Sequence, residues 1–177
     1  MDELTGLAAD GLTRMLLPDP ARFPQTARRS ADGTRLVAEG QNTRYAAIVA
    51  LGLARVDPGV QNAVLAGNTV AALTGQAADD ALHGDDPGAV ALAAWAAAET
   101  GTPPPDALLD RLTAILDGPG PIPTVDYAWA LTAAVATPDL PDRDRRCAAA
   151  ADRLQSVQGP DGLFPHLIPP GAQNRLR

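Results

Sequence analysis

Three carboxylates, Glu39, Asp86 and Asp126, stand at or just before the first turn of three alanine-rich segments of this 177-residue chain. Two carboxyl groups about 5–10 Å apart can act as general acid and general base in the cleavage of a glycosidic bond. If the three carboxylates face one cavity, they provide such a pair, so we predict them as the catalytic candidates. Tyr45 and Trp129 lie close to them in the sequence. Their aromatic faces would then bind a ligand by stacking on a sugar ring.

Each of these residues also has a structural interpretation. Asp86 and Thr124 are suitable helix caps, and Asp126 complements the positive end of a helix dipole. The aromatic rings are typical of a core. Arg44 is harder to explain in this way, because a cation at the start of an apolar helix opposes the dipole. We therefore predict that Arg44 pairs with a carboxylate or meets an anion, and we include it among the ligand-binding candidates.

The segments that must position these residues are alanine-rich and begin near Tyr45, Ala89 and Tyr127, and each is followed by a more polar segment with helical periodicity. A helix that is apolar nearly all round must be buried on every side, and amphipathic helices cover it. Starting points about 40 residues apart match the length of one helical hairpin with its loops. The pattern predicts helices over residues 2–17, 43–56, 60–78, 87–99, 106–117, 124–136 and 142–158.

One long segment, residues 18–41, contains prolines and an Asp-Gly turn and predicts irregular structure. A segment of this length is either functional, for example a lid, or a surface crossing between the first helix and the repeats. No stretch of the chain alternates as a half-buried strand does. The predicted fold class is therefore all-α, with helical hairpin repeats in a single domain over residues 1–177.

Three short motifs resemble the α/α-toroid proteins, which include six-hairpin glycosidase-like enzymes and the prenyltransferase and terpene-cyclase group. Residues 158–165 (QGPDGLFP) are similar to the Gln-x-x-x-Gly-x-aromatic repeat of the cyclase-like toroids. Residues 85–92 (DDPGAVAL) look like the start of an inner helix in either group. Residues 39–45 (EGQNTRY) resemble the start of the first inner helix in six-hairpin sugar-acting proteins. The resemblance implies a partial or complete α/α toroid, and it covers residues 39–165.

The chain also departs from these families. It lacks the Asp-x-Asp-Asp motif of class II cyclases, and one cysteine with two histidines does not assemble the zinc ligands expected of protein prenyltransferases. A closed ring of six hairpins needs roughly 250 residues, whereas this chain supplies about three hairpins and an N-terminal helix. We therefore expect an open arc, a fragment of a longer toroid, or a subunit completed by a second copy or another partner. The exposed flank of an open arc favours a homo-oligomer or a partner subunit.

Inner helices of toroids direct their N-terminal ends toward one end of the ring, where unpaired N–H groups gather. The resemblance therefore implies a ligand site at three helix starts, formed by Glu39, Gln41, Asn42, Arg44 and Tyr45, by Asp85 and Asp86, and by Asp126, Tyr127 and Trp129. The leading hypothesis is a protein that binds or processes a carbohydrate or a similar small neutral ligand there, as a glycoside hydrolase or epimerase does. The alternatives are a terpene-cyclase-like enzyme with an apolar, aromatic-lined cavity, and a non-catalytic helical scaffold or accessory subunit. Whether the chain is an enzyme is left open.

Composition narrows the choice of partners. A net charge of −7 and a pI of about 4.6 argue against binding to nucleic acid or anionic membranes, which needs a basic face. Aromatic residues make up only 3% of the chain, so the core is built from small side chains that leave little room for a large cofactor, and none is predicted. The chain has neither a signal-peptide pattern nor an apolar run of about 20 residues. We expect a soluble, cytoplasmic protein without membrane insertion.

A cluster of carboxylates with one imidazole could hold a divalent cation through Asp79, Asp80, His83, Asp85 and Asp86. Its spacing matches no specific metal loop, and a solvated acidic turn explains it, so no metal site is predicted. Cys147 is interpreted as a small buried filler rather than a reactive thiol. His166 lies beside prolines, where a structural role is favoured over that of a proton shuttle.

Overall fold

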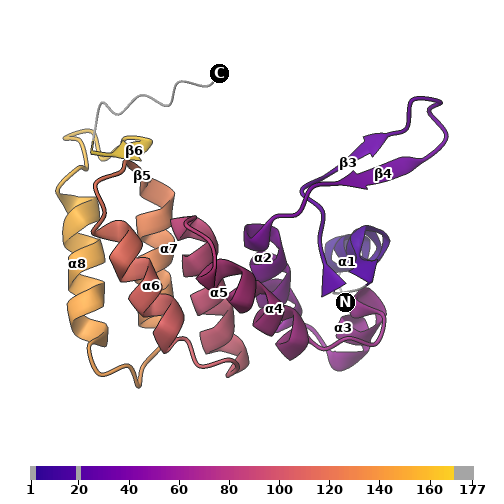
Figure 1. The fold of residues 1–177 in the computed structure, drawn as a ribbon, viewed down its shortest axis with the longest axis horizontal. Helices are drawn as coiled ribbons and strands as arrows, with labels where there is room; N and C mark the ends of the chain where they lie inside the picture. The colour runs from indigo at the N-terminus through magenta and orange to yellow at the C-terminus, as the bar shows by residue number, and fades with distance from the viewer. Residues whose placement is uncertain (1–2, 19–20, 170–177) are drawn as a thin grey trace.

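The computed structural model describes residues 3–18 and 21–169 of the chain, and most of them are helical (Figure 1). The helices are α1 (Glu3–Met15), α2 (Thr43–Leu53), α3 (Pro58–Leu65), α4 (Val70–Leu82), α5 (Pro87–Thr100), α6 (Asp106–Leu116), α7 (Thr124–Val135) and α8 (Arg143–Gln155). The strands are β1 (Leu17–Pro18), β2 (Ala21–Arg22), β3 (Thr26–Arg29), β4 (Leu36–Glu39), β5 (Ile122–Pro123) and β6 (Leu167–Ile168). The expected largely helical fold is confirmed, but the expectation of no strands is wrong.

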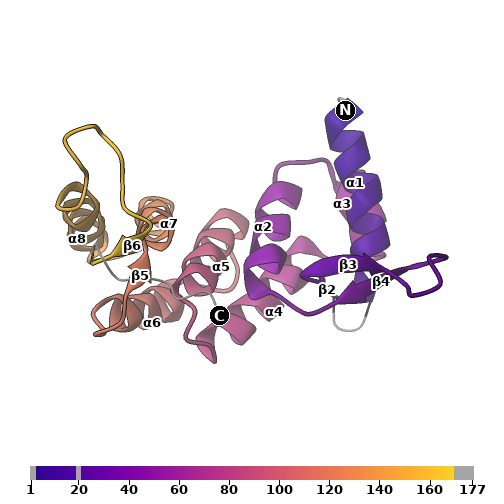
Figure 2. The same ribbon diagram turned by 90° about the horizontal axis from the view of Figure 1, so that it is seen from above.

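Helices α2, α5 and α7 lie side by side in one row, with α5 in the middle (Figure 2). Helix α4 packs against α2 and α5, and α6 packs against α5 and α7, so these two helices form a second layer. Helix α8 packs against α7 at one end of the molecule, and α1 packs against α3 at the other. The hairpins therefore build two layers, as the alternation of apolar and polar segments predicts. These contacts show two layers of helices and do not show a ring.

Helix α5 is the centre of the core. Nine of its 14 residues are buried, and six of these nine are alanines, which present little bulk to the neighbouring helices. The prediction of burial on every side holds for α5 and is wrong for the other two helices of the row. In α2 the buried residues follow one face, while Ile48 is 46% exposed. In α7, Val125 and Val135 are exposed. Both helices keep a solvent-facing side.

The segment predicted as one helix over residues 60–78 is two helices, α3 and α4. Ala66 ends α3 in the left-handed region at φ 50°, and Gly67 follows at φ 90°. Thr69 then caps α4, because its hydroxyl accepts a hydrogen bond from the backbone N–H of Ala72 at 3.0 Å. The break turns the chain so that α4 reaches both α2 and α5.

Residues 18–41 are more regular than the sequence predicts. Strands β3 and β4 pair antiparallel, with Thr26 opposite Glu39 and Arg29 opposite Leu36. A turn joins them, in which Gly33 has φ 72° and the side chain of Asp32 accepts a hydrogen bond from the backbone of Thr34. All eight strand residues are exposed, and the hairpin projects away from the helices (Figure 1).

The start of α7 is fixed by a distant part of the chain. Strand β6 pairs with β5 directly before α7, and the backbone N–H of Thr124 donates to the carbonyl of His166 at 3.0 Å. The hydroxyl of Thr124 donates to the carbonyl of Pro165 and does not cap the helix, so the predicted capping role of Thr124 is wrong. Across the residues that the structure describes, no helix combines the length and the apolar character needed to cross a membrane.

Candidate functional site

Arg44, in the first turn of α2, joins the starts of α5 and α7. Its Nε donates to Oδ2 of Asp86 at 2.8 Å, and its Nη2 donates to Oδ1 of the same carboxylate. Its Nη1 and Nη2 donate to the two oxygens of Asp126, each at 3.1 Å. One guanidinium thus holds two carboxylates through two hydrogen bonds each, a geometry that its planar fork of donors allows. The predicted pairing of Arg44 with a carboxylate is confirmed, and α2, α5 and α7 begin at the same end of the molecule.

Trp129 completes this group from α7. The guanidinium carbon of Arg44 lies 5.3 Å from the centroid of the indole ring, within the range of a cation–π contact. The ring also packs against core residues of both larger hydrophobic clusters. Arg44 therefore covers one face of Trp129, and that face is not free to stack on a sugar ring.

Gly88 lets the guanidinium lie this close to α5. A Cβ at this position would stand 2.6 Å from Nη2 of Arg44 and would also overlap the guanidinium carbon. Any side chain here would displace Arg44. The sequence shows Gly88 only as part of an Asp-Pro-Gly turn that starts a helix, so its role in the Arg44 group could not be found without the fold.

The two carboxylates of the Arg44 group have different environments. Asp126 has no exposed surface, and burial raises its pKa, against the opposing charge and hydrogen bonds of Arg44. Asp86 is half-buried, and burial also raises its pKa. The hydrogen bonds and charge of Arg44 outweigh this effect, so the net pKa of Asp86 is lowered. Asp86 also caps α5, because its Oδ1 accepts from the backbone N–H of Gly88 at 3.1 Å.

Glu39, the third predicted catalytic carboxylate, lies elsewhere. It is in β4 of the exposed hairpin, where its Oε2 is 2.9 Å from Nε of Arg28. Tyr45 follows Arg44 in α2, but 42% of its surface is exposed and it is not a partner of the Arg44 group. The structure therefore brings together Arg44, Asp86, Asp126 and Trp129, and leaves Glu39 and Tyr45 outside.

A polar recess lies beside the Arg44 group, at the starts of α2 and α5. It consists of two adjoining pockets of about 260 Å³ and about 250 Å³, which share part of their walls. The recess is lined by Arg22, Phe23, Gln41, Asn42, Thr43, Ala46, Asp80, Ala81, Gly84, Asp85, Asp86 and Ala89. The sequence predicts Gln41, Asn42, Asp85 and Asp86 of this set at the helix starts, and it groups Asp80 with Asp85 and Asp86 in one acidic turn. It does not connect Arg22 with them.

Two charged residues of the recess, Arg22 and Asp80, are paired with each other. Arg22 donates to the side-chain oxygen of Gln41 at 2.9 Å and to Oδ1 of Asp80 at 3.4 Å. Gln76 donates to the same oxygen of Asp80 at 3.0 Å. Asn42 caps α2 by accepting from the backbone N–H of Arg44 at 2.9 Å. Among residues 3–18 and 21–169, the structure records no hydrogen bond from the hydroxyl of Thr43 and none to the carboxylate of Asp85.

The remaining polar residues considered in the sequence do not form a cluster of metal ligands within the described part of the chain. No group of three or more His, Cys, Asp or Glu side chains with the geometry for a metal ion occurs within the described residues. His83 ends α4 with its imidazole 78% exposed and its Nδ1 2.8 Å from the carbonyl of Asp79. Cys147 is half-buried in α8, and His166 is exposed beside β6.

The chain was compared with protein-family models, curated proteins and solved structures, and none matches it. The resemblance to α/α toroids therefore rests on the short motifs at residues 39–45, 85–92 and 158–165. The recess and the Arg44 group are therefore the features of this chain that bear on its function.

Proposed function

We propose that this chain binds a small, neutral, polyhydroxylated ligand of the carbohydrate class in the polar recess at the starts of α2 and α5. The observation that carries the proposal is the lining: side-chain donors and acceptors converge there from three separate segments, around residue 22, residues 41–43 and residues 80–86. Sites for small ligands place a few polar groups in a concave surface in this way.

The pairing of the two arginines favours a neutral ligand over an anion. Arg22 donates to Asp80 and Gln41, although its Nε is buried without a partner among the described residues, and Arg44 is held by two carboxylates, so each cation already has a carboxylate partner. The hydroxyl of Thr43 and the carboxylate of Asp85 are left to exchange hydrogen bonds with a ligand. A hydroxyl that both donates and accepts, beside a carboxylate that accepts, suits the hydroxyl groups of a sugar.

The proposal includes an open section of an α/α toroid as the architecture. The row of α2, α5 and α7, backed by α4 and α6, supports this arrangement, because all three helices of the row begin at the Arg44 group. In a toroid the ligand site lies at that end of the inner helices. The recess is at this end, where Asp86 belongs to both the recess and the Arg44 group.

The recess supports binding of a ligand more directly than catalysis. Glycosidic cleavage needs two carboxyl groups that both reach the substrate. Of the three predicted catalytic carboxylates only Asp86 lines the recess, since Asp126 has no exposed surface and Glu39 is paired with Arg28 in the projecting hairpin. A second candidate function is a non-catalytic scaffold or accessory subunit. It is favoured by the hydrogen bonds of Arg44 to two carboxylates, because a group that joins three helices stabilises the fold without binding a ligand.

The proposal is tested by ligand-observed NMR with glucose, maltose and myo-inositol as probes, followed by titration of any probe that binds. Replacing Asp85 with Ala removes an exposed acceptor and is expected to weaken binding by about 10-fold or more, the effect of losing a hydrogen bond to a charged group. Thr43→Val should weaken binding by a smaller factor. Asp79→Ala is the matched control, because Asp79 is exposed in the same acidic stretch but does not line the recess.

Two results would contradict the carbohydrate proposal. One is the absence of any signal from all three probes with a folded protein, which would favour the scaffold. The other is binding that Asp85→Ala and Asp79→Ala change equally, since the recess would then not be the site.

A further inference from the structure

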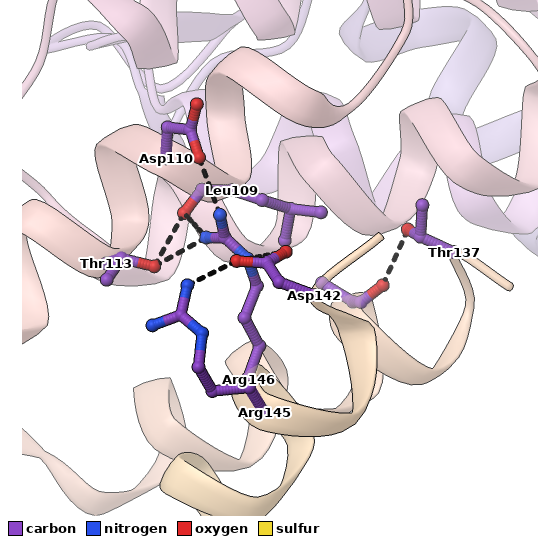
Figure 3. Close-up of polar contacts among 8 residues, drawn as sticks. Leu109, Asp110, Thr113, Thr137, Asp142, Arg145 and Arg146 are labelled. Carbon is purple, nitrogen blue, oxygen red and sulfur yellow. Dashed lines mark hydrogen bonds and ion pairs between the residues drawn. The ribbon is translucent and has the colours of Figure 1, made fainter. Parts of the chain in front are cut away.

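A larger pocket, of about 400 Å³, lies between α6, α7 and α8, away from the polar recess. Its lining is Leu109, Leu112, Thr113, Leu116, Asp117, Gly118, Tyr127, Ala130, Ala134, Arg145, Arg146, Ala149, Ala150 and Arg153. Arg146 of α8 joins this helix to α6 beside the pocket. Figure 3 shows Arg146 extending from α8 toward Asp110, Thr113 and the carbonyl of Leu109 on α6.

The polar side chains of Thr113 and Tyr127 in the lining of this pocket form hydrogen bonds with the protein itself. The hydroxyl of Thr113 donates to the carbonyl of Leu109 at 2.9 Å and accepts from Arg146 at 2.6 Å. The hydroxyl of Tyr127 donates to the carbonyl of Leu116 at 3.4 Å. The hydroxyl groups of Thr113 and Tyr127 therefore have protein partners. The floor beside them is formed by leucine and alanine side chains, and the charged side chains of Asp117, Arg145, Arg146 and Arg153 form the polar part of the lining. Such a floor favours a hydrocarbon chain over a sugar.

The α8 side of the pocket carries three guanidinium groups, those of Arg145, Arg146 and Arg153. Arg146 is saturated by Asp142, Asp110 and groups of α6. Arg145 shares the carboxylate of Asp142 with Arg146, so one carboxylate faces two guanidinium groups. Arg153 is exposed, and within the described part of the chain the structure records no carboxylate partner for it. The lining also contains one carboxylate, Asp117, at the C-terminal end of α6.

We propose that this pocket binds an amphipathic carboxylate, such as a medium-chain fatty acid. The hydrocarbon chain lies on Leu109, Leu112 and Leu116, and the carboxylate meets the guanidinium groups of Arg145 and Arg153. The argument for an anion is charge complementarity: in a chain of net charge −7, this side of the pocket offers one guanidinium without a carboxylate partner and one that shares its partner. The site is separate from the polar recess and stands whether or not the recess binds a carbohydrate.

The first test is calorimetric titration of the full chain with decanoate and, as a neutral counterpart, decan-1-ol. We expect decanoate to bind with a Kd below about 1 mM and decan-1-ol to bind about 10-fold more weakly. Ala149→Trp places a large side chain at an exposed position of the lining and is expected to abolish decanoate binding. Ala148→Trp is the matched control: Ala148 is exposed on the same helix but outside the lining, so this variant should bind as the unmodified protein does.

The second test addresses the carboxylate group of the ligand. Arg153→Glu should weaken decanoate binding by about 10-fold and leave decan-1-ol unchanged, while Arg14→Glu, on the exposed surface of α1, should change neither. The proposal is overturned if decanoate does not bind, if Ala149→Trp binds it as well as Ala148→Trp does, or if decan-1-ol binds as tightly as decanoate. Circular dichroism spectra of each variant confirm that lost binding does not come from unfolding.

Discussion

Two arginines, Arg44 and Arg146, each bind two carboxylates and join separate helices, and they differ in what surrounds those carboxylates. The partners of Arg44 belong to two other helices, whereas Arg146 binds Asp110 of α6 and Asp142 at the start of its own helix. Arg44 holds Asp126, which has no exposed surface, and Asp86, whose side chain is 45% exposed. Arg146 holds Asp142, with 29% of its side chain exposed, and Asp110, with 73% exposed. The residue types are alike, but Arg44 donates two hydrogen bonds to each carboxylate, whereas Arg146 donates one to each. A second difference is that, of the two groups, only the Arg44 group contains a charge that water cannot reach.

This contrast separates two uses of the same ion pair. A charge buried without its partner costs several kcal/mol, whereas an exposed charge that loses its partner is simply solvated. The Arg44 group therefore fixes the relative positions of α2, α5 and α7. The Arg146 group joins α8 to α6 less tightly, and the pocket of about 400 Å³ opens along the same pair of helices.

The largest expected effect is the loss of Arg44. Arg44→Ala leaves the carboxylate of Asp126 buried without a cation and should lower the free energy of unfolding by about 3 kcal/mol. Arg146→Ala removes bonds to exposed or backbone groups and should lower it by about 1–2 kcal/mol. Urea unfolding followed by circular dichroism measures both values. Arg55→Ala is a control, since Arg55 pairs with Glu99 at the surface with 67% of its side chain exposed, and about 0.5 kcal/mol or less is expected. Equal losses for Arg44→Ala and Arg146→Ala would remove the distinction between the two groups.

Gly88→Ala gives an intermediate effect on the same group. The added Cβ would overlap the guanidinium of Arg44, so the variant has to move Arg44 away from its carboxylates. We expect a loss of about 2 kcal/mol in the free energy of unfolding, in the range of overpacked cores. Gly75→Ala is the matched control, because Gly75 is within α4 with no atom within 4 Å of an added Cβ. Alanine is the better helix former, so this control should gain up to about 1 kcal/mol. A neutral or stabilising Gly88→Ala would show that Arg44 does not depend on this close approach.

The sequence predicts part of this arrangement and leaves out the rest for a physical reason. Asp86 was expected as a helix cap, and its side chain accepts a backbone hydrogen bond in the first turn of α5, as that of Asn42 does in α2. These are local interactions, set by residue type and by position relative to the apolar run. The need of Arg44 for a carboxylate also follows from its place at a helix start. Its actual partners lie 42 and 82 residues further along the chain, which only the packing of α2, α5 and α7 decides.

The failures of sequence-based prediction have the same origin. The helix breaks at Ala66, which has a positive φ of 50°. Alanine rarely adopts this conformation, so the residue type does not predict the break. The β3–β4 hairpin has no buried face, so its residues lack the alternation by which strands are recognised. Glu39 was grouped with Asp86 and Asp126 because it precedes α2. The turn after β4, with Gly40 at φ 71°, instead leaves Glu39 in the hairpin beside Arg28.

The pH dependence of stability provides the finest test of the comparison, because the two carboxylates on Arg44 should contribute with opposite signs. Hydrogen bonds and charge from Arg44 lower the pKa of Asp86 despite its burial, relative to an ordinary value of 3.8. The folded state therefore favours the ionised form. The stability that Asp86 contributes is complete above pH 3.8 and is lost as the pH falls through its lowered pKa. Burial raises the pKa of Asp126 above 3.8, so its contribution is present below pH 3.8 and is lost as the pH rises through the raised pKa.

Asp86→Asn and Asp126→Asn separate these two contributions with little change of side-chain volume, and asparagine at position 86 can still cap α5. The measurement is urea unfolding of both variants and the unmodified protein from about pH 2.5 to about pH 7. The stability lost in Asp86→Asn should grow as the pH rises, with most of the change below pH 3.8. The stability lost in Asp126→Asn should shrink as the pH rises above 3.8, because the unmodified protein then has to ionise a buried carboxyl that asparagine does not have. Slopes of the same sign in the two variants would mean that burial does not distinguish the carboxylates. The contrast with the carboxylates bound by Arg146, which are both more exposed than Asp126, would then have to be explained by hydrogen bonding alone.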